Sequence, residues 1–494
     1  MNKKIYLISP PAGEKRKSYP FSLMYLHSYL RKNNFGSEVL DCDVLGWKAK
    51  RLVRYLAENK AEIIGVTGYT YNRFTAYNTI REIKSDLPGC RIIVGGRHFS
   101  ALAEETLERM KEVDFVVRGE GEITLQELCT AIYYNKPTNG ILGITFRERG
   151  NIISTPDRPP VLDLDSLHYN LDDFVGLKGG YDFVSTMRRF PTSKGFTVMA
   201  GRGCPGSCVF CTLSSQRVRL RSVTNVLDEI EHLIRITGIR NVSFGDPTLT
   251  ASKRYITDLC EGILKRNLNI KWHCYSRVDT PFEVFDLMRK AGCVSVDIAL
   301  ESASLRILKA IKKNIKPEEV SKCTRKLREL GIKSFIFAMI SLPDEREEDA
   351  EMTVKFLEDS ASIINGASLA ITQIFPDAAL YGIAQKRNLL PAGFNWFDNY
   401  YCDDYYDRNY SKSTVPFYKE HLSMDFIKKM RGRFERLYMK RFYDRYRFTS
   451  EFKKVLGPFL FDWKNQTMNS KVKKVKKGIS RLPYLLKGGS RSGV

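Results

Sequence analysis

The sequence contains no apolar run approaching the roughly 18–20 residues that a membrane-spanning helix needs. Its opening stretch, MNKKIYLISPP, has lysines and a short apolar segment, but Pro10 and Pro11 end that segment early. We therefore expect a first β-strand rather than a secretory signal, and a cytoplasmic protein. The eleven cysteines are an odd number in a chain without a signal, which argues against a disulfide framework and for reduced thiols or metal ligands.

The composition is that of a globular protein with one strongly basic end. The 494 residues are enough for two or three domains, and 43% of them are hydrophobic. The net charge of +23 is unevenly spread, because residues 381–494 hold 25 Lys and Arg against 10 Asp and Glu. We find no convincing internal repeat.

The first third of the chain alternates apolar stretches with amphipathic ones, which is typical of βαβ units and a parallel sheet. Glycines follow several of these stretches, where open α/β sheets place their ligands. We expect a doubly wound (Rossmann-like) domain over residues 1–150 and a proline-containing connector over residues 151–195. The expected strands are residues 4–9, 37–43, 62–70, 91–99, 114–122 and 140–148.

A second alternation begins at residue 196 and continues to about residue 380. Six strand-then-helix units in this length predict a partial (β/α)6 barrel, and a second doubly wound sheet is the competing interpretation. Both place a functional site at the carboxyl ends of the strands. The expected strands are residues 196–200, 241–246, 270–276, 293–301, 332–343 and 367–376.

Three cysteines follow the first of these strands in the stretch GRGCPGSCVFCTLSS, residues 201–215. Cys204, Cys208 and Cys211 have the spacing C-x3-C-x2-C, with no nearby fourth Cys or His. A structural zinc site needs four protein ligands, so zinc would have to recruit a distant residue such as Cys260 or Cys274. Three thiolates instead suit a 4Fe–4S cluster with one iron left open for chemistry.

This motif, with Phe210 before the last cysteine, resembles that of the radical S-adenosylmethionine (SAM) superfamily. The resemblance covers about residues 196–380. It implies that the open iron chelates SAM, and that an electron from an external flavodoxin- or ferredoxin-type reductant releases a 5′-deoxyadenosyl radical that takes a hydrogen atom from the substrate. The cofactor then carries the chemistry and the protein orients it.

Other stretches resemble the family's SAM-binding segments. FGDPTLT and YSRVD follow the second and third strands, ALESAS follows the fourth, and ISLPDE is similar to a Gly-Leu-Pro-Gly motif in which Ser341 and Asp344 replace the glycines. Asp246 has the alternative role of capping the next helix. The resemblance assigns SAM contacts to Phe210, Gly245, Asp246, Ser276, Arg277, Glu301, Ser302, Leu342 and Pro343.

The stretch VGGRHFSALAEETL, followed by VDFVVRGEGEITLQEL, resembles the cobalamin-binding domain that precedes many radical SAM barrels. The family usually has Gly-Gly-Pro-His where this chain has Gly-Gly-Arg-His. Glycines there would let the backbone approach a large corrin. The resemblance assigns cobalamin contacts to Thr67, Gly68, Gly95, Gly96, Arg97, His98, Gly119, Glu120 and Gly121.

The sequence lacks the Asp-x-His-x-x-Gly motif whose histidine binds cobalt in methyl-transferring mutases and synthases. We therefore expect His98 to be a loop residue or a support for ligand-contacting residues. Relatives without this motif include proteins that bind cobalamin and proteins that keep only the fold, and both alternatives stay open.

The basic, aromatic-rich region 381–494 has three interpretations. It forms a helical cap on the barrel with a solvated tail, it attaches to an anionic membrane surface, or it binds nucleic acid, for which no recognition module is present. Residues 424–446 have apolar groups at helical spacing. A membrane contact would make the protein peripheral at the inner membrane face.

The leading hypothesis is a radical SAM enzyme that uses cobalamin to methylate an unactivated carbon of a small, hydrophobic or lipid-like substrate. The close alternative starts from the same radical but leads to cyclisation, carbon–carbon coupling or oxidation. A non-catalytic iron–sulfur electron-transfer protein is the third hypothesis. No acid or base is assigned.

Overall fold

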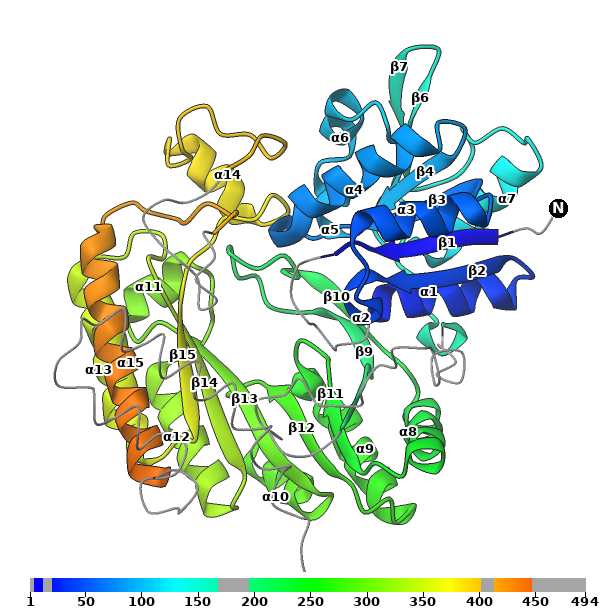
Figure 1. Cartoon of the computed structure of the whole chain (residues 1–494). Helices are drawn as coiled ribbons and strands as arrows, with labels where there is room; N and C mark the ends of the chain where they lie inside the picture. The colour runs from blue at the N-terminus through cyan, green and yellow to red at the C-terminus, as the bar shows by residue number, and fades with distance from the viewer. Residues whose placement is uncertain (1–3, 12–19, 168–194, 401–412, 447–494) are drawn as a thin grey trace, which may run out of the picture. The chain divides into compact units, whose positions relative to one another are not determined.

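The computed structural model describes residues 4–11, 20–167, 195–400 and 413–446. The chain forms two compact units, Met1–Ile427 and Lys428–Val494. The first unit contains two large sheets, and each sheet is built from one of the two alternating regions of the sequence (Figure 1).

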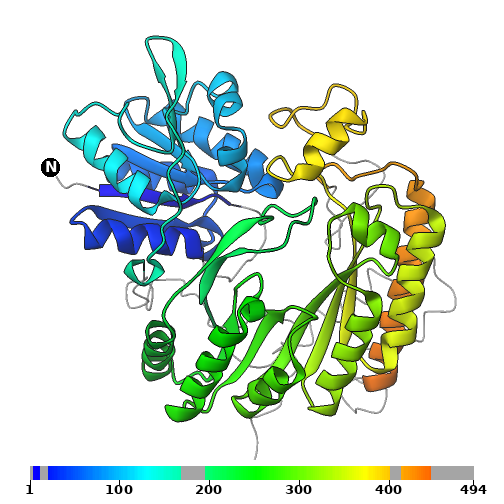
Figure 2. The same ribbon diagram turned by 180° about the vertical axis from the view of Figure 1, so that it is seen from behind.

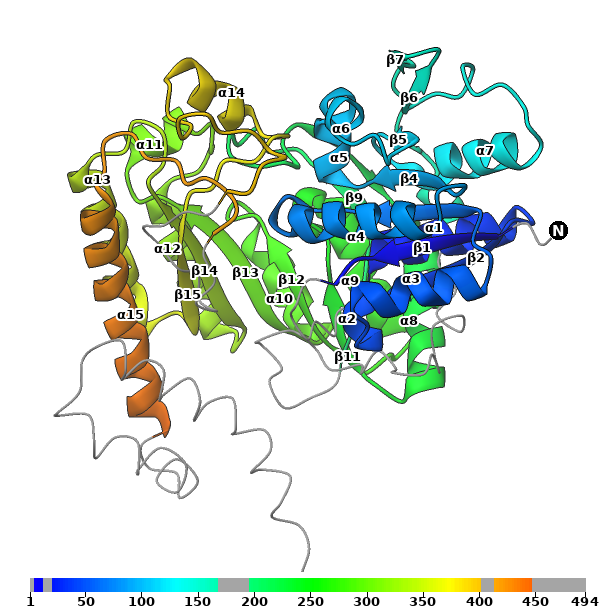
Figure 3. The same cartoon turned by 45° about the horizontal axis from the view of Figure 1, so that its top comes forward.

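The first sheet has the strand order β2-β1-β3-β4-β5-β6-β7. Its first five strands are parallel, and their apolar runs are buried because helices cover both faces. Helix α1 packs against α7, and α3 packs against α4. Figure 3 shows α3 and α4 side by side on one face of the sheet. The elements are β1 Lys4–Ser9, α1 Phe21–Lys32, β2 Gly36–Asp41, α2 Cys42–Leu45, α3 Ala49–Glu58, β3 Ile63–Thr67, α4 Arg73–Asp86, β4 Arg91–Gly95, α5 Arg97–Ala101, α6 Ala103–Arg109, β5 Phe115–Val117 and α7 Gly121–Tyr133.

The doubly wound arrangement is confirmed, since the order reverses between β1 and β3. The expectation of a parallel sheet is wrong for the last two strands. β6 (Ile144–Glu148) and β7 (Asn151–Ser154) form an antiparallel hairpin, so the sheet extends into the stretch expected to be a connector. Both turn residues, Arg149 and Gly150, have positive φ, which suits the two-residue turns that match strand twist.

The second sheet has six parallel strands in the sequential order β15-β14-β13-β12-β11-β8. A sequential order without reversal confirms the partial barrel and excludes the second doubly wound sheet. The helices cover the outer face (Figure 2). The elements are β8 Phe196–Val198, α8 Val223–Thr237, β11 Asn241–Phe244, α9 Lys253–Lys265, β12 Lys271–Ser276, α10 Phe282–Lys290, β13 Cys293–Glu301, α11 Leu305–Ala310, α12 Pro317–Glu329, β14 Lys333–Ile340, α13 Glu347–Asp359 and β15 Gly366–Ile371.

A two-stranded antiparallel ribbon follows the first barrel strand, and the sequence did not predict it. β9 (Gly201–Cys204) pairs with β10 (Gln216–Leu220), and the cysteine loop connects them. A β-carbon at Gly201 would lie 2.6 Å from the carbonyl oxygen of Arg219, so the close pairing needs glycine there. Glycine is a poor strand former, which explains why the pattern was missed.

Part of the region that follows the barrel packs against the first domain. α14 (Ala379–Lys386) is followed by Trp396 and Phe397, which are buried in the core of the first domain. The Phe397 ring stacks on Tyr77 at a centroid distance of 5.2 Å, and Arg73 Nε donates a hydrogen bond to Trp396 O at 2.9 Å. The segment at Trp396 and Phe397 therefore packs on the first domain, and we call it the strap; none of the three interpretations of the region 381–494 included this contact.

The expected helix at 424–446 is confirmed as α15 (Met424–Tyr446). In the described part of the chain, no helix is both long and apolar enough to span a bilayer. The basic stretch 471–494, on which the predicted membrane contact depends, lies outside the described residues, and that contact stays a prediction.

Candidate functional site

The three cysteines are free, half-buried thiols on one loop. Cys204 ends β9, and a turn brings Cys211 N within 3.1 Å of Cys208 O. A β-carbon at Gly206 would lie 3.5 Å from Cys204 Sγ and 3.9 Å from Cys208 Sγ, so these sulfurs face one small space. The arrangement fits a metal cluster with three thiolate ligands.

The distant cysteines that a zinc site would need are elsewhere. Cys260 on α9 and Cys274 on β12 are fully buried and interact with Cys293 on β13, between the sheet and its helices. Burial raises the pKa of both thiols, as expected for structural cysteines. The structure therefore gives no support to the zinc interpretation.

The cysteine loop is tied to the barrel by its backbone. Val209 N donates to Ile311 O at 3.1 Å, and Leu380 N donates to Val209 O at 2.8 Å. Val209 and Phe210 pack in a small apolar cluster with Leu342. The loop after β14, which also holds the buried Pro343, thus lies against the cysteine loop, and the assignment of SAM contacts to Leu342 and Pro343 stays a prediction.

Three cations surround the cysteine loop. The Arg277 guanidinium acts on Cys204 and Cys208, Lys313 acts on Cys208, and Arg97 acts on Cys211. Burial raises the pKa of Cys208 and Cys211, and the cations oppose that rise. A bound cluster with thiolate ligands carries negative charge, so this setting suits it.

Glu301 reaches this region from the end of β13 through an unusual backbone. Its φ is 64°, and the β13–β14 register shifts between Ala299 and Glu301. Such a conformation is costly for a non-glycine residue and occurs at functional sites. The buried Glu301 carboxylate lies 3.4 Å from Lys313 Nζ; burial raises its pKa and Lys313 opposes the rise. Glu301 thus lies beside the cysteine loop, and the Lys313 ammonium balances the charge of its carboxylate.

Asp246 and Gly245 brace the first two barrel strands. Asp246 Oδ2 accepts a hydrogen bond from Ala200 N at 3.0 Å, and burial raises the pKa of this carboxyl to about 6. The suggestion that Asp246 caps the next helix is wrong, because Ser252 caps α9. A β-carbon at Gly245 would lie 2.6 Å from Met199 Sδ, so packing requires this glycine.

The predicted SAM-binding serines are engaged inside the protein. Ser276 Oγ lies 2.9 Å from Thr250 Oγ1, and Ser302 Oγ lies 3.2 Å from Thr353 Oγ1. Arg277 forms two hydrogen bonds with Asp279, at 2.8 and 2.6 Å. These contacts order the loops after β12 and β13, and the assignment of SAM contacts to these residues stays a prediction.

Ser341 and Asp344, which replace the family's glycines, both have positive φ, 68° and 60°. Their side chains make contacts that glycine lacks. Ser341 Oγ donates to Tyr418 O at 2.5 Å, and Asp344 Oδ1 accepts from Arg387 at 3.0 Å. The loop therefore keeps a glycine-type backbone, while its side chains attach Arg387 and Tyr418 to the barrel.

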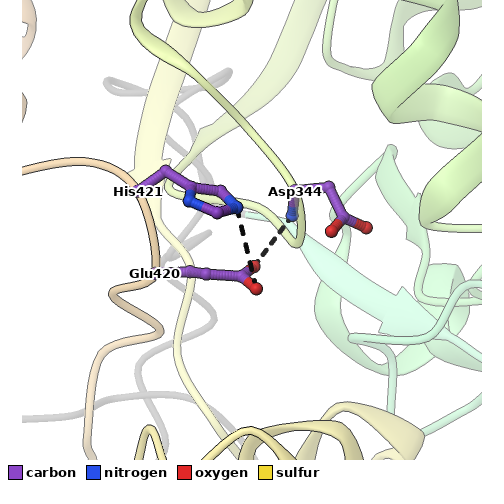
Figure 4. A group of neighbouring side chains, drawn as sticks. All are labelled: Asp344, Glu420 and His421. Carbon is purple, nitrogen blue, oxygen red and sulfur yellow. Dashed lines mark hydrogen bonds and ion pairs between the residues drawn. The ribbon is translucent and has the colours of Figure 1, made fainter.

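Asp344, Glu420 and His421 form a group of possible metal ligands whose nearest ligand atoms lie within 4.8 Å of one another. Asp344 N donates to Glu420 Oε2, while the Asp344 carboxylate points away from the other two side chains (Figure 4). Arg387 already supplies the counter-charge, at 2.7 Å from Glu420 Oε1. We interpret the group as an ion-pair network.

The glycine loops of the first sheet gather at the carboxyl ends of β3, β4 and β5. Gly68 N donates to Gly95 O at 3.1 Å, which joins the first two loops. A β-carbon at Gly96 (φ 94°) would lie 2.9 Å from Gly68 O and 3.0 Å from Thr67 Oγ1. Gly119 also has positive φ, 71°, and among the described residues no heavy atom apart from those of Gly119 and its chain neighbours lies within 4 Å of its β-carbon position. The edge is thus compact at Gly96 and open at Gly119, where a large ligand could approach.

His98 is fully buried, and the protein engages both of its ring nitrogens. Nε2 lies 2.5 Å from the Tyr77 hydroxyl oxygen and Nδ1 lies 3.3 Å from Thr70 Oγ1. Burial, aided by the nearby Arg73 guanidinium, lowers the pKa of His98 to about 3. This neutral, occupied imidazole supports the loop and leaves no nitrogen for cobalt.

Glu120 contacts the barrel ribbon. It accepts hydrogen bonds from Arg219 at 2.9 and 2.7 Å, and Arg202 lies 3.3 Å from it and 2.6 Å from Glu122. Gly121 begins α7 close to Leu26, its β-carbon position lying 3.1 Å from Leu26 Cδ2. Glu120 therefore joins the loop after β5 to the strands that flank the cysteine loop.

Arg202, Arg219 and Lys313 were not among the predicted site residues. A signal for Arg219 is present, since QRVRLR alternates arginine with apolar residues as a strand does, but the glycine-flanked Arg202 has no such signal. Nothing local identifies their acidic partners, which lie 80 and 99 positions away.

Two family models match the chain, the radical SAM superfamily over residues 198–357 and the B12 binding domain over residues 15–129. An uncharacterized methyltransferase of Pyrococcus horikoshii is 30% identical over 80% of this chain and 85% of its own length. The chain belongs to the cobalamin-dependent radical SAM superfamily. It is accordingly a radical SAM enzyme, and the hypothesis of a non-catalytic electron-transfer protein is wrong.

Other relatives in the superfamily include a cyclase. An anaerobic magnesium-protoporphyrin IX monomethyl ester cyclase of Rubrivivax gelatinosus is 26% identical over 69% of this chain and 62% of its own length. Among solved structures, the radical SAM methyltransferase TsrM of Kitasatospora setae, with cobalamin and a 4Fe–4S cluster bound, has a TM-score of 0.69 and 19% identity, over 88% of this chain and 91% of its own. That likeness shows the fold.

The cofactors of this cobalamin-dependent radical SAM enzyme are a 4Fe–4S cluster, SAM and cobalamin. Enzymes of the superfamily act on small substrates and need a reductant. The residues fit these groups: three free thiols among cations suit the cluster, and the open edge at Gly119 suits a corrin.

Proposed function

We propose that this enzyme transfers a methyl group to an unactivated carbon of a hydrophobic or lipid-like biosynthetic intermediate. One observation carries the proposal: the loop after β4 in the cobalamin-binding domain touches the cysteine loop, through the hydrogen bond from Arg97 Nη1 to Thr212 O at 2.6 Å. Methyl transfer needs the corrin near the site of radical formation, and touching loops provide that proximity. The Pyrococcus relative, named a methyltransferase, supports the same conclusion.

When bound, the cluster with SAM supplies a 5′-deoxyadenosyl radical and cobalamin supplies the methyl group. Cys204, Cys208 and Cys211 would hold the cluster, and the surrounding cations stabilise its charge. Glu301, on its strained backbone, would contact SAM beside Lys313. Phe210 and Leu342 form an apolar wall that excludes water from the reacting groups.

Cyclisation, coupling or oxidation without methyl transfer is the second candidate. The Rubrivivax cyclase supports it, because that relative aligns with more than two thirds of this chain. Both candidates start with the same radical, so they differ in whether a methyl group leaves the corrin.

The decisive experiment is anaerobic. The reconstituted protein is supplied with methylcobalamin, SAM and dithionite, and both the bound-corrin spectrum and 5′-deoxyadenosine are measured. Stoichiometric corrin with 5′-deoxyadenosine, lost in Cys208→Ala but retained in the matched loop variant Ser207→Ala, is the expected result. 5′-Deoxyadenosine without retained corrin would refute methyl transfer in favour of the second candidate. An intact cluster that yields no 5′-deoxyadenosine would refute both.

A further inference from the structure

Arg97 lies at the first position of α5, in the loop after β4, and its side chain reaches the barrel. Nη1 donates to Thr212 O at 2.6 Å and lies 3.4 Å from Asp377 Oδ2. Thr212 directly follows Cys211, and Asp377 lies in the loop between β15 and α14. One guanidinium thus contacts the cysteine loop and a second barrel loop from the cobalamin-binding domain.

Phe210, just before the last cysteine, packs against the barrel, but among the described residues the other hydrogen bonds recorded after that cysteine stay within the loop. Leu213 N donates to Cys211 Sγ at 3.4 Å and Ser215 N donates to Gly206 O at 2.6 Å, and both bonds lie within the loop. Val209 is attached to the barrel, but it precedes Cys211. Arg97 is therefore the contact from outside the loop that the structure records at Thr212.

The chemistry of arginine suits this position. Both contacts are made by Nη1 at the end of a long side chain that keeps its charge, whereas a proline offers no donor and a lysine ammonium lacks the fixed direction of the guanidinium N–H groups. The Asp377 side chain is 18% exposed and the Arg97 side chain is 40% exposed, so solvent screens part of this ion pair and the hydrogen bond to Thr212 O is the closer contact. The Arg97 charge also acts on the Cys211 sulfur.

We propose that Arg97 is a positioning residue that holds the cobalamin-binding loop after β4 against the cysteine loop and stabilises the negative charge of the loaded cluster. The inference rests on the proposed function for its second half, because only a loaded chain has that charge. Its first half is a property of the protein alone. Loss of Arg97 frees residues 208–215 and the loop after β4 together, and shifts the cluster's midpoint potential to more negative values.

The test compares Arg97→Gln, Arg97→Pro and Arg97→Lys with the wild type. Proline is tolerated at the first position of a helix, so Arg97→Pro keeps the start of α5. Arg91→Gln is the matched control, since Arg91 begins β4, the strand just before Arg97, is exposed and pairs with Asp114. Far-ultraviolet circular dichroism verifies that each variant is folded.

The first measurement is hydrogen–deuterium exchange of the full chain without cofactors. Faster exchange in peptides covering 208–215 and 96–101 is expected in Arg97→Gln and Arg97→Pro, with a smaller effect in Arg97→Lys and none in Arg91→Gln. Unchanged exchange in both regions would overturn the inference. This arm needs no cluster, so it decides the positioning role even where the proposed function fails.

The second measurement uses the reconstituted chain. Loss of a hydrogen bond from a charged donor should weaken retention of hydroxocobalamin by about tenfold or more. Redox titration followed by electron paramagnetic resonance should give a more negative potential in Arg97→Gln than in Arg97→Lys. Equal retention and equal potentials in all variants would overturn the role toward the cofactors. A wild type that assembles no cluster would instead refute the proposed function.

Discussion

Arg219 donates two hydrogen bonds to the carboxylate of Glu120, at 2.9 and 2.7 Å. Arg219 lies on β10, after the cysteine loop, and Glu120 lies in the loop after β5. The two residues lie 99 positions apart, and this bidentate pair joins the cobalamin-binding domain to the barrel ribbon. Arg219 is buried and Glu120 is partly exposed, with side-chain exposures of 7% and 23%. The hydrogen bonds from Arg219 and the Arg202 charge outweigh burial, so the pKa of Glu120 lies below its ordinary value.

The first prediction concerns this pair. Arg219→Ala should lower the free energy of unfolding by about 3 kcal/mol, because it leaves a partly buried carboxylate with fewer partners. Arg217→Ala, at an exposed position of the same strand, should change it by less than about 0.5 kcal/mol. In a double-mutant cycle with Glu120→Gln, measured by urea denaturation, a coupling of about 1–3 kcal/mol is expected. Additive effects would show that the pair contributes nothing of its own.

The second prediction is a pH dependence caused by His98. Its folded-state pKa of about 3 lies below the ordinary value of 6.5. Between these two pH values the imidazole is protonated in the unfolded chain and neutral in the folded chain. The contribution of His98 to the free energy of unfolding is therefore fully present above pH 6.5 and is lost as the pH drops toward 3.

Relative to His98→Gln, the wild type should lose about 3 kcal/mol of its free energy of unfolding between pH 7.5 and pH 4.5. Chemical denaturation at several pH values measures this, and His232→Gln, on the partly exposed part of α8, is the control. A parallel pH profile in His98→Gln would contradict the buried, neutral imidazole.

The third prediction concerns the left-handed backbone at Asp344. Glycine adopts a φ of 60° without strain, whereas this backbone conformation destabilises an alanine by about 1 kcal/mol or more. Both substitutions remove the same partly exposed ion pair with Arg387. Asp344→Gly should therefore be more stable than Asp344→Ala by about 1 kcal/mol in thermal unfolding. Equal stabilities would mean that this residue does not keep a positive φ in solution.

The fourth prediction concerns Lys313, which lies between Glu301 and Cys208. Lys313→Met removes a cation beside the proposed cluster, so the cluster's midpoint potential should become more negative, as measured by redox titration with electron paramagnetic resonance. Lys309→Met, at an exposed position of α11, should leave the potential unchanged. Identical potentials in the wild type and Lys313→Met would place the cluster outside the field of Lys313.

Much of the architecture could be predicted because the patterns that indicate it each lie within a short stretch of sequence. The apolar runs of β1, β3 and β4 are continuous because parallel strands are covered on both faces, and this local pattern needs no knowledge of distant residues. The C-x3-C-x2-C spacing is equally local. The strand order of the second sheet follows the chain order, so counting units was enough to find the partial barrel.

The failures have physical reasons of two kinds. The strand at β6 was expected, but β7 is only four residues long and its antiparallel pairing with β6 was missed, while Gly201 and Gly203 weaken the strand signal of the β9–β10 ribbon. The strap at Trp396 and Phe397 was missed because two apolar residues in an irregular segment carry no local pattern that indicates which domain core they pack into. In the structure, Phe397 stacks on Tyr77 of the first domain.

The sequence by itself determined the two α/β domains and the family, and it predicted the cysteine ligands, because periodicity and motif spacing act over a few residues. Tertiary structure alone decided which charges meet. It placed Arg97 against Thr212, Arg219 against Glu120, and both nitrogens of His98 against neighbouring hydroxyls. The physical reason is that these partners lie 21 to 115 positions apart, and only the packing of complete elements brings their polar atoms within hydrogen-bonding distance.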